Sequence, residues 1–218
     1  MSLGIHLSLV IPVYNESRRM ARLTGGLLQF DRTNRDLFYE IVLVNDGSTD
    51  DTSGELEKLR KNLLQESGEN LSGIEVVNLR SNGGKGVALK KGIEIARGNW
   101  ILTIDADMAS VPEEIFRWQS FDPGLVLERK PGSPRVYMGA REHPASRIKD
   151  FFIRRALGRV FNLAVQFVTG LEYDDTQCGF KLYPAETARM VFSRLHETGW
   201  AHDVEILRDL ARSGVPVS

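Results

Sequence analysis

The chain has 218 residues, of which 42% are hydrophobic and 26% are charged. This balance is typical of a globular protein that buries one sizeable core, and it excludes intrinsic disorder, collagen and coiled coil. The 28 basic and 29 acidic side chains leave a formal net charge of −1, so no overall charge excess points to nucleic acid or to an acidic polymer. Any electrostatic role must therefore be local.

Cys178 is the only cysteine, which excludes an internal disulfide framework and a metal cluster of the Cys/His type. A single thiol fits a reducing compartment. The four histidines show no metal-ligand spacing, and we interpret them as structural or surface residues. The sequence shows no signal peptide and no apolar run of about 18 residues or more, so we expect no membrane-spanning helix in it.

Four short apolar runs each end in polar residues, as buried strands do where they meet a loop. They are residues 5–11, 41–44, 74–79 and 100–104, ending respectively at Pro12, Asn45, Ser81 and Asp105. Helix-like stretches follow the first three runs, at about 17–30, 51–66 and 86–97. The alternation predicts one α/β domain with a mostly parallel sheet, whose ligands bind beyond the carboxyl ends of the strands.

The second half of the chain has a different composition. Residues 122–134 are rich in proline and glycine, and we expect a strand at 135–139. Nine basic and two acidic residues give 129–159 a local charge of +7, which leaves −8 for the rest. Apolar residues in 148–168 recur at helical spacing beside arginines. This basic amphipathic segment fits either a membrane interface or ordinary packing on the core.

Asp105 and Asp107 directly follow the fourth predicted strand, with only Ala106 between them. Two carboxylates at a strand end suit Mg²⁺ or Mn²⁺ shared with a diphosphate, because both cations prefer oxygen ligands. The alternative interpretation is a solvated turn or a helix cap ahead of Pro112.

Residues 82–86 (Asn-Gly-Gly-Lys-Gly) open a helix after a strand, so backbone N–H groups and Lys85 can face a nucleotide there. The segment is neither a dinucleotide-binding fingerprint nor a P-loop, and a plain glycine-rich turn remains the alternative. Asp46 in Asp46-Gly47-Ser48 fits either a tight turn with a helix cap or a ligand contact.

Together with residues 12–16 (Pro-Val-Tyr-Asn-Glu) and 175–181 (Asp-Thr-Gln-Cys-Gly-Phe-Lys), these strand-end elements form a pattern. In order and spacing it resembles family 2 glycosyltransferases of the GT-A fold, over residues of about 8–215. Within that family the chain is most similar to the polyprenyl-phosphate branch, in particular the dolichyl-phosphate β-glucosyltransferases.

The resemblance implies roles for the matching residues. Pro12, Tyr14 and Glu16 would line the nucleobase pocket. Asp46 would contact the base or ribose, and Lys85 would lie beside the nucleotide. Asp105 would meet the ribose or the metal, and Asp107 would bind the metal.

The sequence differs from two related groups of glycosyltransferases, and the differences narrow the expected donor and reaction. Ala109 stands where mannosyl-phosphate synthases commonly have glutamine, which favours a UDP-sugar donor over a GDP-sugar. The chain also lacks the Gln-x-x-Arg-Trp motif of processive polysaccharide synthases, so elongation of a polymer is not expected.

The acceptor decides which further residues matter. If the acceptor is a sugar hydroxyl, Asp203 is the candidate general base, since the hydroxyl must lose a proton as it attacks. If it is a phosphate monoester, its second pKa of about 6 leaves the nucleophile mostly ionised, and no strong base is needed. Cationic side chains must then hold the acceptor phosphate, and the candidates are Arg141, Arg154 and Arg155. The alternative is that these arginines only form a solvated charged face of a helix.

We therefore expect a single GT-A domain over 1–218, with a nucleotide-binding part at about 5–110 and an acceptor-binding part at about 111–218. The expected reaction is metal-dependent, inverting transfer of a hexose, glucose by preference, from a UDP-sugar to a polyprenyl phosphate. The expected location is the cytosolic face of a membrane, with peripheral attachment. A transferase acting on a saccharide hydroxyl and a catalytically silent sugar-nucleotide-binding module remain alternatives. The resemblance also implies a natural chain that continues past Ser218.

Overall fold

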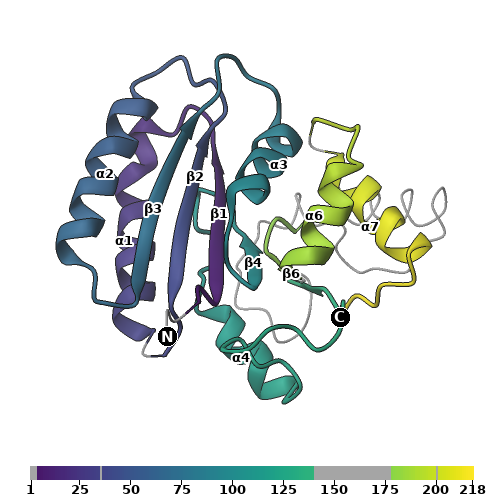
Figure 1. Cartoon of the computed structure of the whole chain (residues 1–218). Coiled ribbons are helices and arrows are strands. Elements are labelled where there is room, and N and C mark those ends of the chain that lie inside the picture. The colour runs from purple at the N-terminus through teal and green to yellow at the C-terminus, as the bar shows by residue number, and fades with distance from the viewer. Residues whose placement is uncertain (1–3, 35, 140–177, 200) are drawn as a thin grey trace, which may run out of the picture.

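The computed structural model describes residues 4–34, 36–139, 178–199 and 201–218. At its centre is one sheet of six strands: β1 (Leu7–Val13), β2 (Tyr39–Asn45), β3 (Leu71–Asn78), β4 (Trp100–Thr103), β5 (Tyr137–Met138) and β6 (Lys181–Pro184). Their order is β3-β2-β1-β4-β6-β5 (Figure 1). The first four strands are parallel, whereas β6 runs antiparallel to β4 and β5. The predicted α/β class with a mostly parallel sheet is confirmed.

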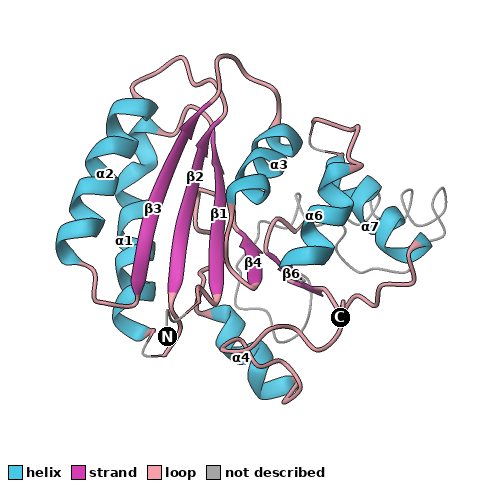
Figure 2. Ribbon diagram, viewed as in Figure 1, coloured by secondary structure: helices cyan, strands magenta, loops and turns pink. Residues whose placement is uncertain are grey.

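Helices cover both faces of the sheet, as Figure 2 shows. One face packs against α1 (Met20–Thr33), α2 (Thr52–Glu66) and α4 (Glu114–Phe121). The other packs against α3 (Lys85–Ile95), α6 (Ala185–Ser193) and α7 (His202–Arg212). The three helices expected in the first half are therefore present, with bounds shifted by a few residues and a 3₁₀ turn, η1 (Ser17–Arg19), ahead of α1.

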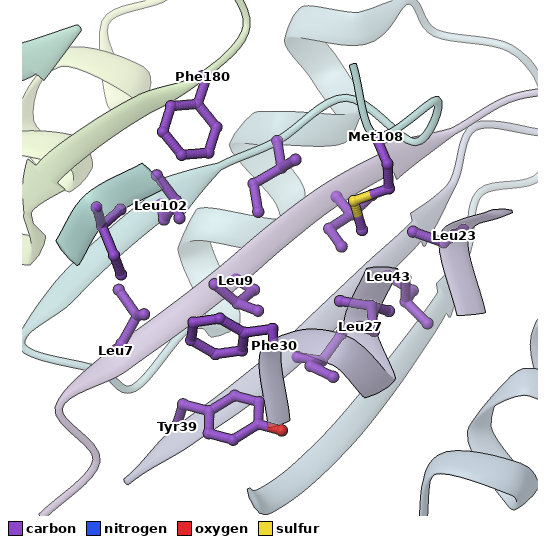
Figure 3. Close-up of a cluster of buried hydrophobic side chains, with 14 of the residues drawn as sticks. Leu7, Leu9, Leu23, Leu27, Phe30, Tyr39, Leu43, Leu102, Met108 and Phe180 are labelled. Atoms are coloured by element: carbon purple, nitrogen blue, oxygen red, sulfur yellow. The ribbon is translucent and has the colours of Figure 1, made fainter. Parts of the chain in front are cut away.

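The covering helices explain why the strands are apolar on both sides. Successive side chains of β1 point to opposite faces, so Leu9 joins the core under α1 while Val10 joins the core under α3. Figure 3 shows the first core, in which Leu9 lies near Phe30 and Tyr39. Phe30 and Tyr39 meet edge to face with ring centroids 5.1 Å apart.

Helix α3 approaches the sheet closely because Gly92 has no side chain. A Cβ atom at this position would lie 2.5 Å from Cγ1 of Val10, which is closer than two carbon atoms can approach without displacement. The short distance packs α3 against β1 and β2, with its first turn toward their carboxyl ends. Lys85, the first residue of the helix, is thereby placed at the sheet edge where a parallel α/β fold binds its ligands.

The expected stop at Pro12 is wrong, because β1 continues through Pro12 to Val13. The carbonyl oxygen of Val10 accepts a hydrogen bond from the N–H of Ile104, so the backbone polar groups of Val10 point toward β4. Pro12 lies two residues further along β1, so its backbone nitrogen points the same way. Strand β4 already ends at Thr103, opposite Val10. Pro12 therefore lies beyond the partner strand, where its missing N–H costs no hydrogen bond in the ladder.

The sequence interpretation did not include β6 or α6. Strand β6 has the sequence Lys-Leu-Tyr-Pro and all four residues are buried. Its first residue is a lysine, which breaks any apolar run at that point. The structure accommodates the lysine by pairing it with a carboxylate from α7, a contact between residues 22 positions apart.

The basic amphipathic segment at 148–168 lies outside the described residues, and so do Arg141, Arg154 and Arg155. The strand expected at 135–139 is present as the shorter β5. No helix within the described part of the chain is both long and apolar enough to span a membrane.

Candidate functional site

A pocket of about 460 Å³ opens at the carboxyl ends of β1, β2 and β4. It collects every residue expected to contact the donor or the metal, although these residues are spread over nearly 100 positions of sequence. Its lining is Pro12, Val13, Tyr14, Glu16, Arg19, Asp46, Asn82, Gly84, Lys85, Asp105, Ala106 and Asp107. The residues expected at this edge of the sheet therefore line one cavity.

The loops after β1 and β2 are tied together and form one wall of this pocket. The backbone N–H of Asn15 donates to Oγ of Ser48 at 2.9 Å, and the N–H of Thr49 donates back to Oδ1 of Asn15 at 2.9 Å. Asn15 has a φ of 53°, a left-handed conformation that asparagine tolerates better than most residues. The turn leaves Tyr14 with 44% of its surface exposed, so its ring is available to a ligand.

Asp46 is nearly fully buried and holds the glycine-rich loop in place. Its Oδ1 accepts a hydrogen bond from the N–H of Gly83 at 2.8 Å, and its Oδ2 accepts one from the N–H of Gly84 at 2.9 Å. Gly84 has a φ of 92°, and a Cβ atom there would lie 2.3 Å from the backbone oxygen of Thr198. Asp46 thus both lines the pocket and fixes the loop that leads into α3.

Lys85 and Asp105 meet in the lining of the pocket, where Nζ lies 2.5 Å from Oδ1. Burial by itself lowers the pKa of Lys85, but the charges of Asp105 and then Asp203 raise it, and the net pKa lies above the usual lysine value. The ammonium group therefore stays charged at neutral pH. Roughly a third of the Lys85 side chain remains exposed toward the cavity, which lets it meet an anionic ligand.

The turn after β4 is held by a core contact that the sequence interpretation did not foresee. Met108 has a φ of 51° and is buried in the α1 core, near Leu23 in Figure 3. A Cβ atom at Gly26 of α1 would lie 3.1 Å from Cγ of Met108, so the missing side chain of Gly26 makes room for it. The anchored turn lets Oδ1 of Asp107 accept a hydrogen bond from the N–H of Ala109 at 2.9 Å.

Asp105 and Asp107 fit a divalent cation by the chemistry of their donor atoms. Both line the pocket with hard carboxylate oxygens, of which Mg²⁺ commonly uses one or two while ligand phosphates and water complete its shell. Among the described residues no group of three or more His, Cys, Asp or Glu side chains is placed to hold a metal alone. The pair therefore suits a cation that arrives with an anionic ligand.

Asp203 does not line the pocket. It lies in the first turn of α7, as expected, but its side chain is only 6% exposed and its Oδ1 is 2.6 Å from Nζ of Lys181. Burial by itself raises the pKa of Asp203. The charge interactions with Lys181, then His202 and Lys85, outweigh that effect and hold the pKa below the usual aspartate value.

Arg19 was not singled out from the sequence, and Asn82 and Lys181 were named only as members of motifs. Arg19 and Asn82 line the pocket, and Arg19 forms a two-point contact with Glu16, at 2.6 and 2.7 Å. The three-residue spacing of Glu16 and Arg19 was the available signal. Lys181 belongs to the motif at 175–181, but its partner became evident only from the fold.

Solved structures share this fold. Glucosyl-3-phosphoglycerate synthase from Mycobacterium tuberculosis, solved in complex with UDP, is 18% identical, and the match covers 97% of this chain and 69% of that one with a TM-score of 0.61. The mannosyltransferase PcManGT from Pyrobaculum calidifontis, solved with GDP-Man and Mn²⁺, is 15% identical over 99% of this chain and 55% of that one, with a TM-score of 0.60. The fold is thus GT-A.

Curated relatives are more similar in sequence. Dolichyl-phosphate beta-glucosyltransferase of Homo sapiens is 36% identical over 92% of this chain, and that of Saccharomyces cerevisiae is 35% identical over 93%. The protein of the same name from Dictyostelium discoideum is 33% identical over 99%. The chain spans 61% to 65% of the length of these three relatives. The model of glycosyl transferase family 2 matches residues 8–118, about half of the sequence, and the chain belongs to that family.

Proposed function

We propose that this chain transfers a hexose, glucose by preference, from UDP-glucose to a polyprenyl phosphate, with inversion at the anomeric carbon and with Mg²⁺ or Mn²⁺. One observation carries the proposal: a single cavity brings Tyr14, Lys85, Asp105 and Asp107 together. It thereby combines an aromatic ring for a base, a cation for phosphates and two carboxylates for a metal.

For the donor, we propose that Tyr14 packs on the uracil ring and that Lys85 faces the diphosphate. Asp105 and Asp107 would hold the divalent cation, which would offset negative charge on the departing UDP. Arg19, whose side chain is 61% exposed at the pocket rim, adds a second cation. The donor's ribose and base would contact the wall built by Asp46 and Glu16.

For the acceptor, the names of the curated relatives favour dolichyl or another polyprenyl phosphate. An oxygen of this phosphate would attack the anomeric carbon from the face opposite UDP. The new carbon–oxygen bond forms as the bond to UDP breaks, and UDP leaves with the electron pair. Because the attacking oxygen is already ionised at neutral pH, no residue needs to remove a proton from it.

For location, we propose peripheral attachment at the cytosolic face of a membrane. The +7 charge of residues 129–159 supports this, because a cluster of basic residues is attracted to anionic lipid. Arg141, Arg154 and Arg155 are the proposed phosphate contacts. The basis for these three residues is the sequence, since the segment lies outside the described residues.

Thermal shift with nucleotides tests the donor half of the proposal. With Mn²⁺ present, UDP is expected to raise the melting temperature more than GDP does, because a ligand that binds only the native state stabilises it by mass action. A larger shift with GDP would reverse the donor assignment. Slow Mn²⁺-dependent hydrolysis of UDP-glucose without acceptor is expected as well, and a catalytically silent binding module would show binding without it.

A further inference from the structure

Lys181 and Asp203 form an ion pair that is almost completely buried. Nζ of Lys181 lies 2.6 Å from Oδ1 of Asp203, and the two side chains are 1% and 6% exposed. Removing an ammonium and a carboxylate from water is costly unless they pair and satisfy their remaining hydrogen bonds. Neither side chain lines the pocket, so the pair needs another role.

The pair fixes the backbone that lies against Asp105. Nζ of Lys181 also donates a hydrogen bond to the carbonyl oxygen of Cys178, and Oγ1 of Thr103 donates one to the carbonyl oxygen of Gly179 at 2.8 Å. A Cβ atom at Gly179 would lie 2.4 Å from Oδ2 of Asp105. The Cys178–Gly179 backbone is therefore a wall in direct contact with the first proposed metal ligand.

The same pair also acts on Lys85 through its charge. The N–H of Gly86 donates to the carbonyl oxygen of Thr198 at 2.9 Å, which ties the start of α3 to the segment that leads into α7. The carboxylate of Asp203 and the ammonium of Lys85 also attract each other through their opposite charges. With Lys181 neutralising Asp203, the ammonium of Lys85 remains with Asp105 and faces the cavity.

We propose that Lys181 and Asp203 are positioning residues for the donor site. Lys181 holds Cys178 and Gly179 against Asp105 and balances the charge of Asp203, so that Lys85 and Asp105 keep their arrangement in the cavity. Asp203 in this account takes no proton from the acceptor. The inference rests on the proposed function, because it assumes that the cavity binds a UDP-sugar with a divalent cation.

The test measures the affinity for UDP at saturating Mn²⁺ by calorimetry, in parallel with turnover. The variants are Lys181→Met, Asp203→Asn and the double variant Lys181→Met with Asp203→Leu. The control is Lys91→Met with Glu94→Leu, an exposed pair 2.8 Å apart on α3, the helix that begins with Lys85. Far-UV circular dichroism and a cooperative melt establish that each variant is folded.

Each single variant is expected to weaken UDP binding by about tenfold or more, because it leaves one uncompensated charge behind Lys85 and Asp105. The double variant is expected to bind UDP at least as tightly as the single variant with the lower UDP affinity, since the two residues act as a unit. The control pair should remain within about twofold of the wild type, as expected for an exposed pair.

If the variants that remove a charge do not fold, variants that keep both charges test the same proposal. Asp203→Glu and Lys181→Arg retain both charges but shift the contact. Asp203→Glu is expected to weaken UDP binding about threefold or more while kcat at saturating donor stays within about threefold, since the change acts on ground-state binding. A general base displaced by one methylene would lose kcat instead.

Two results would overturn the inference alone. The first is folded single variants that bind UDP like the wild type. The second is an Asp203→Asn variant that binds UDP normally but transfers sugar about 100-fold more slowly, which is the behaviour of a reacting base. A wild-type chain that binds no UDP with Mn²⁺ would instead refute the proposed function, and the inference with it.

Discussion

Lys85 Nζ lies 2.5 Å from Asp105 Oδ1, where the first turn of α3 meets the carboxyl end of β4. Any divalent cation that uses Asp105 must share this carboxylate with an ammonium group. The two cations compete in the absence of nucleotide, whereas both are favourable once a diphosphate is present.

Lys85→Met should therefore separate metal binding from nucleotide binding. Without nucleotide, Mn²⁺ is expected to bind at least about threefold more tightly to Lys85→Met than to the wild type, because the carboxylate of Asp105 no longer pairs with an ammonium group. With Mn²⁺ present, UDP is expected to bind about tenfold more weakly, because a charge-assisted contact to phosphate is lost. Calorimetry measures both. Lys90→Met, which removes a half-buried lysine of α3 that donates to the carbonyl oxygen of Ser193, is the control. Unchanged UDP affinity in Lys85→Met would contradict the donor role.

Asp107→Ala should abolish Mn²⁺-dependent binding of UDP and leave the fold intact. The half-buried carboxylate makes one local hydrogen bond, to the N–H of Ala109, so the free energy of unfolding should fall by only about 1 kcal/mol. Binding and urea denaturation are measured on the same preparation. Asp36→Ala, at an exposed position outside the cavity, should change neither. Activity that survives in Asp107→Ala at saturating Mn²⁺ would remove Asp107 from the metal site.

Gly179→Ala should weaken Mn²⁺–UDP binding by about tenfold with a much smaller effect on stability. The added methyl group would meet Oδ2 of Asp105 at 2.4 Å, and the carboxylate must turn away from it. Gly25→Ala in α1 is the matched control, since no atom lies within 4 Å of the added Cβ. That substitution should leave binding unchanged and stabilise the helix by about 0.5 to 1 kcal/mol. Equal effects of the two substitutions on affinity would argue against a close Gly179–Asp105 contact.

Asp203→Asn should destabilise the protein in a pH-dependent way. The folded-state pKa of Asp203 lies below the ordinary 3.8, so its contribution to stability is present above the unfolded pKa and is lost as pH falls through the folded pKa. The difference in unfolding free energy between wild type and variant should be about 3 to 5 kcal/mol and level from about pH 5 to about pH 8. Below about pH 4 it should shrink. Urea denaturation across this range provides the measurement, and a difference that persists undiminished at about pH 3 would place Asp203 outside a charged pair.

Much of the fold was predictable, because a parallel sheet with both faces covered leaves continuous apolar runs in the sequence. The runs that became β1, β2, β3 and β4 were all recognisable in this way. Strand β6 was not, because Lys181 interrupts the pattern and its compensating charge lies on another element. The prediction that β1 stops at Pro12 was wrong for a related reason. Whether the missing N–H of Pro12 costs a hydrogen bond depends on where β4 ends, and the sequence near Pro12 does not show that.

The residues that line the cavity were also predictable, since the polar residues that follow parallel strands gather at one edge. Asp105 and Lys85 were candidates from their positions, the resemblance to family 2 glycosyltransferases implied their roles, and the cavity contains both. Their direct contact was not foreseeable, because it depends on how closely α3 approaches the sheet at Gly92. The burial of Asp203 was not foreseeable either, because an aspartate in the first turn of a helix is usually exposed to solvent.

The acceptor is the central claim, and one comparison tests it most directly. Labelled hexose transfer from UDP-glucose is measured with a polyprenyl phosphate and with a saccharide, for the wild type and for Arg141→Ala, Arg155→Ala and Asp203→Asn, after correction for donor affinity. We expect transfer to the lipid phosphate, and each arginine substitution should lower its kcat/KM by roughly 10- to 150-fold, since each removes a charge-assisted contact. Transfer to the saccharide alone, with Asp203→Asn the severe lesion and the arginine substitutions mild, would contradict the account.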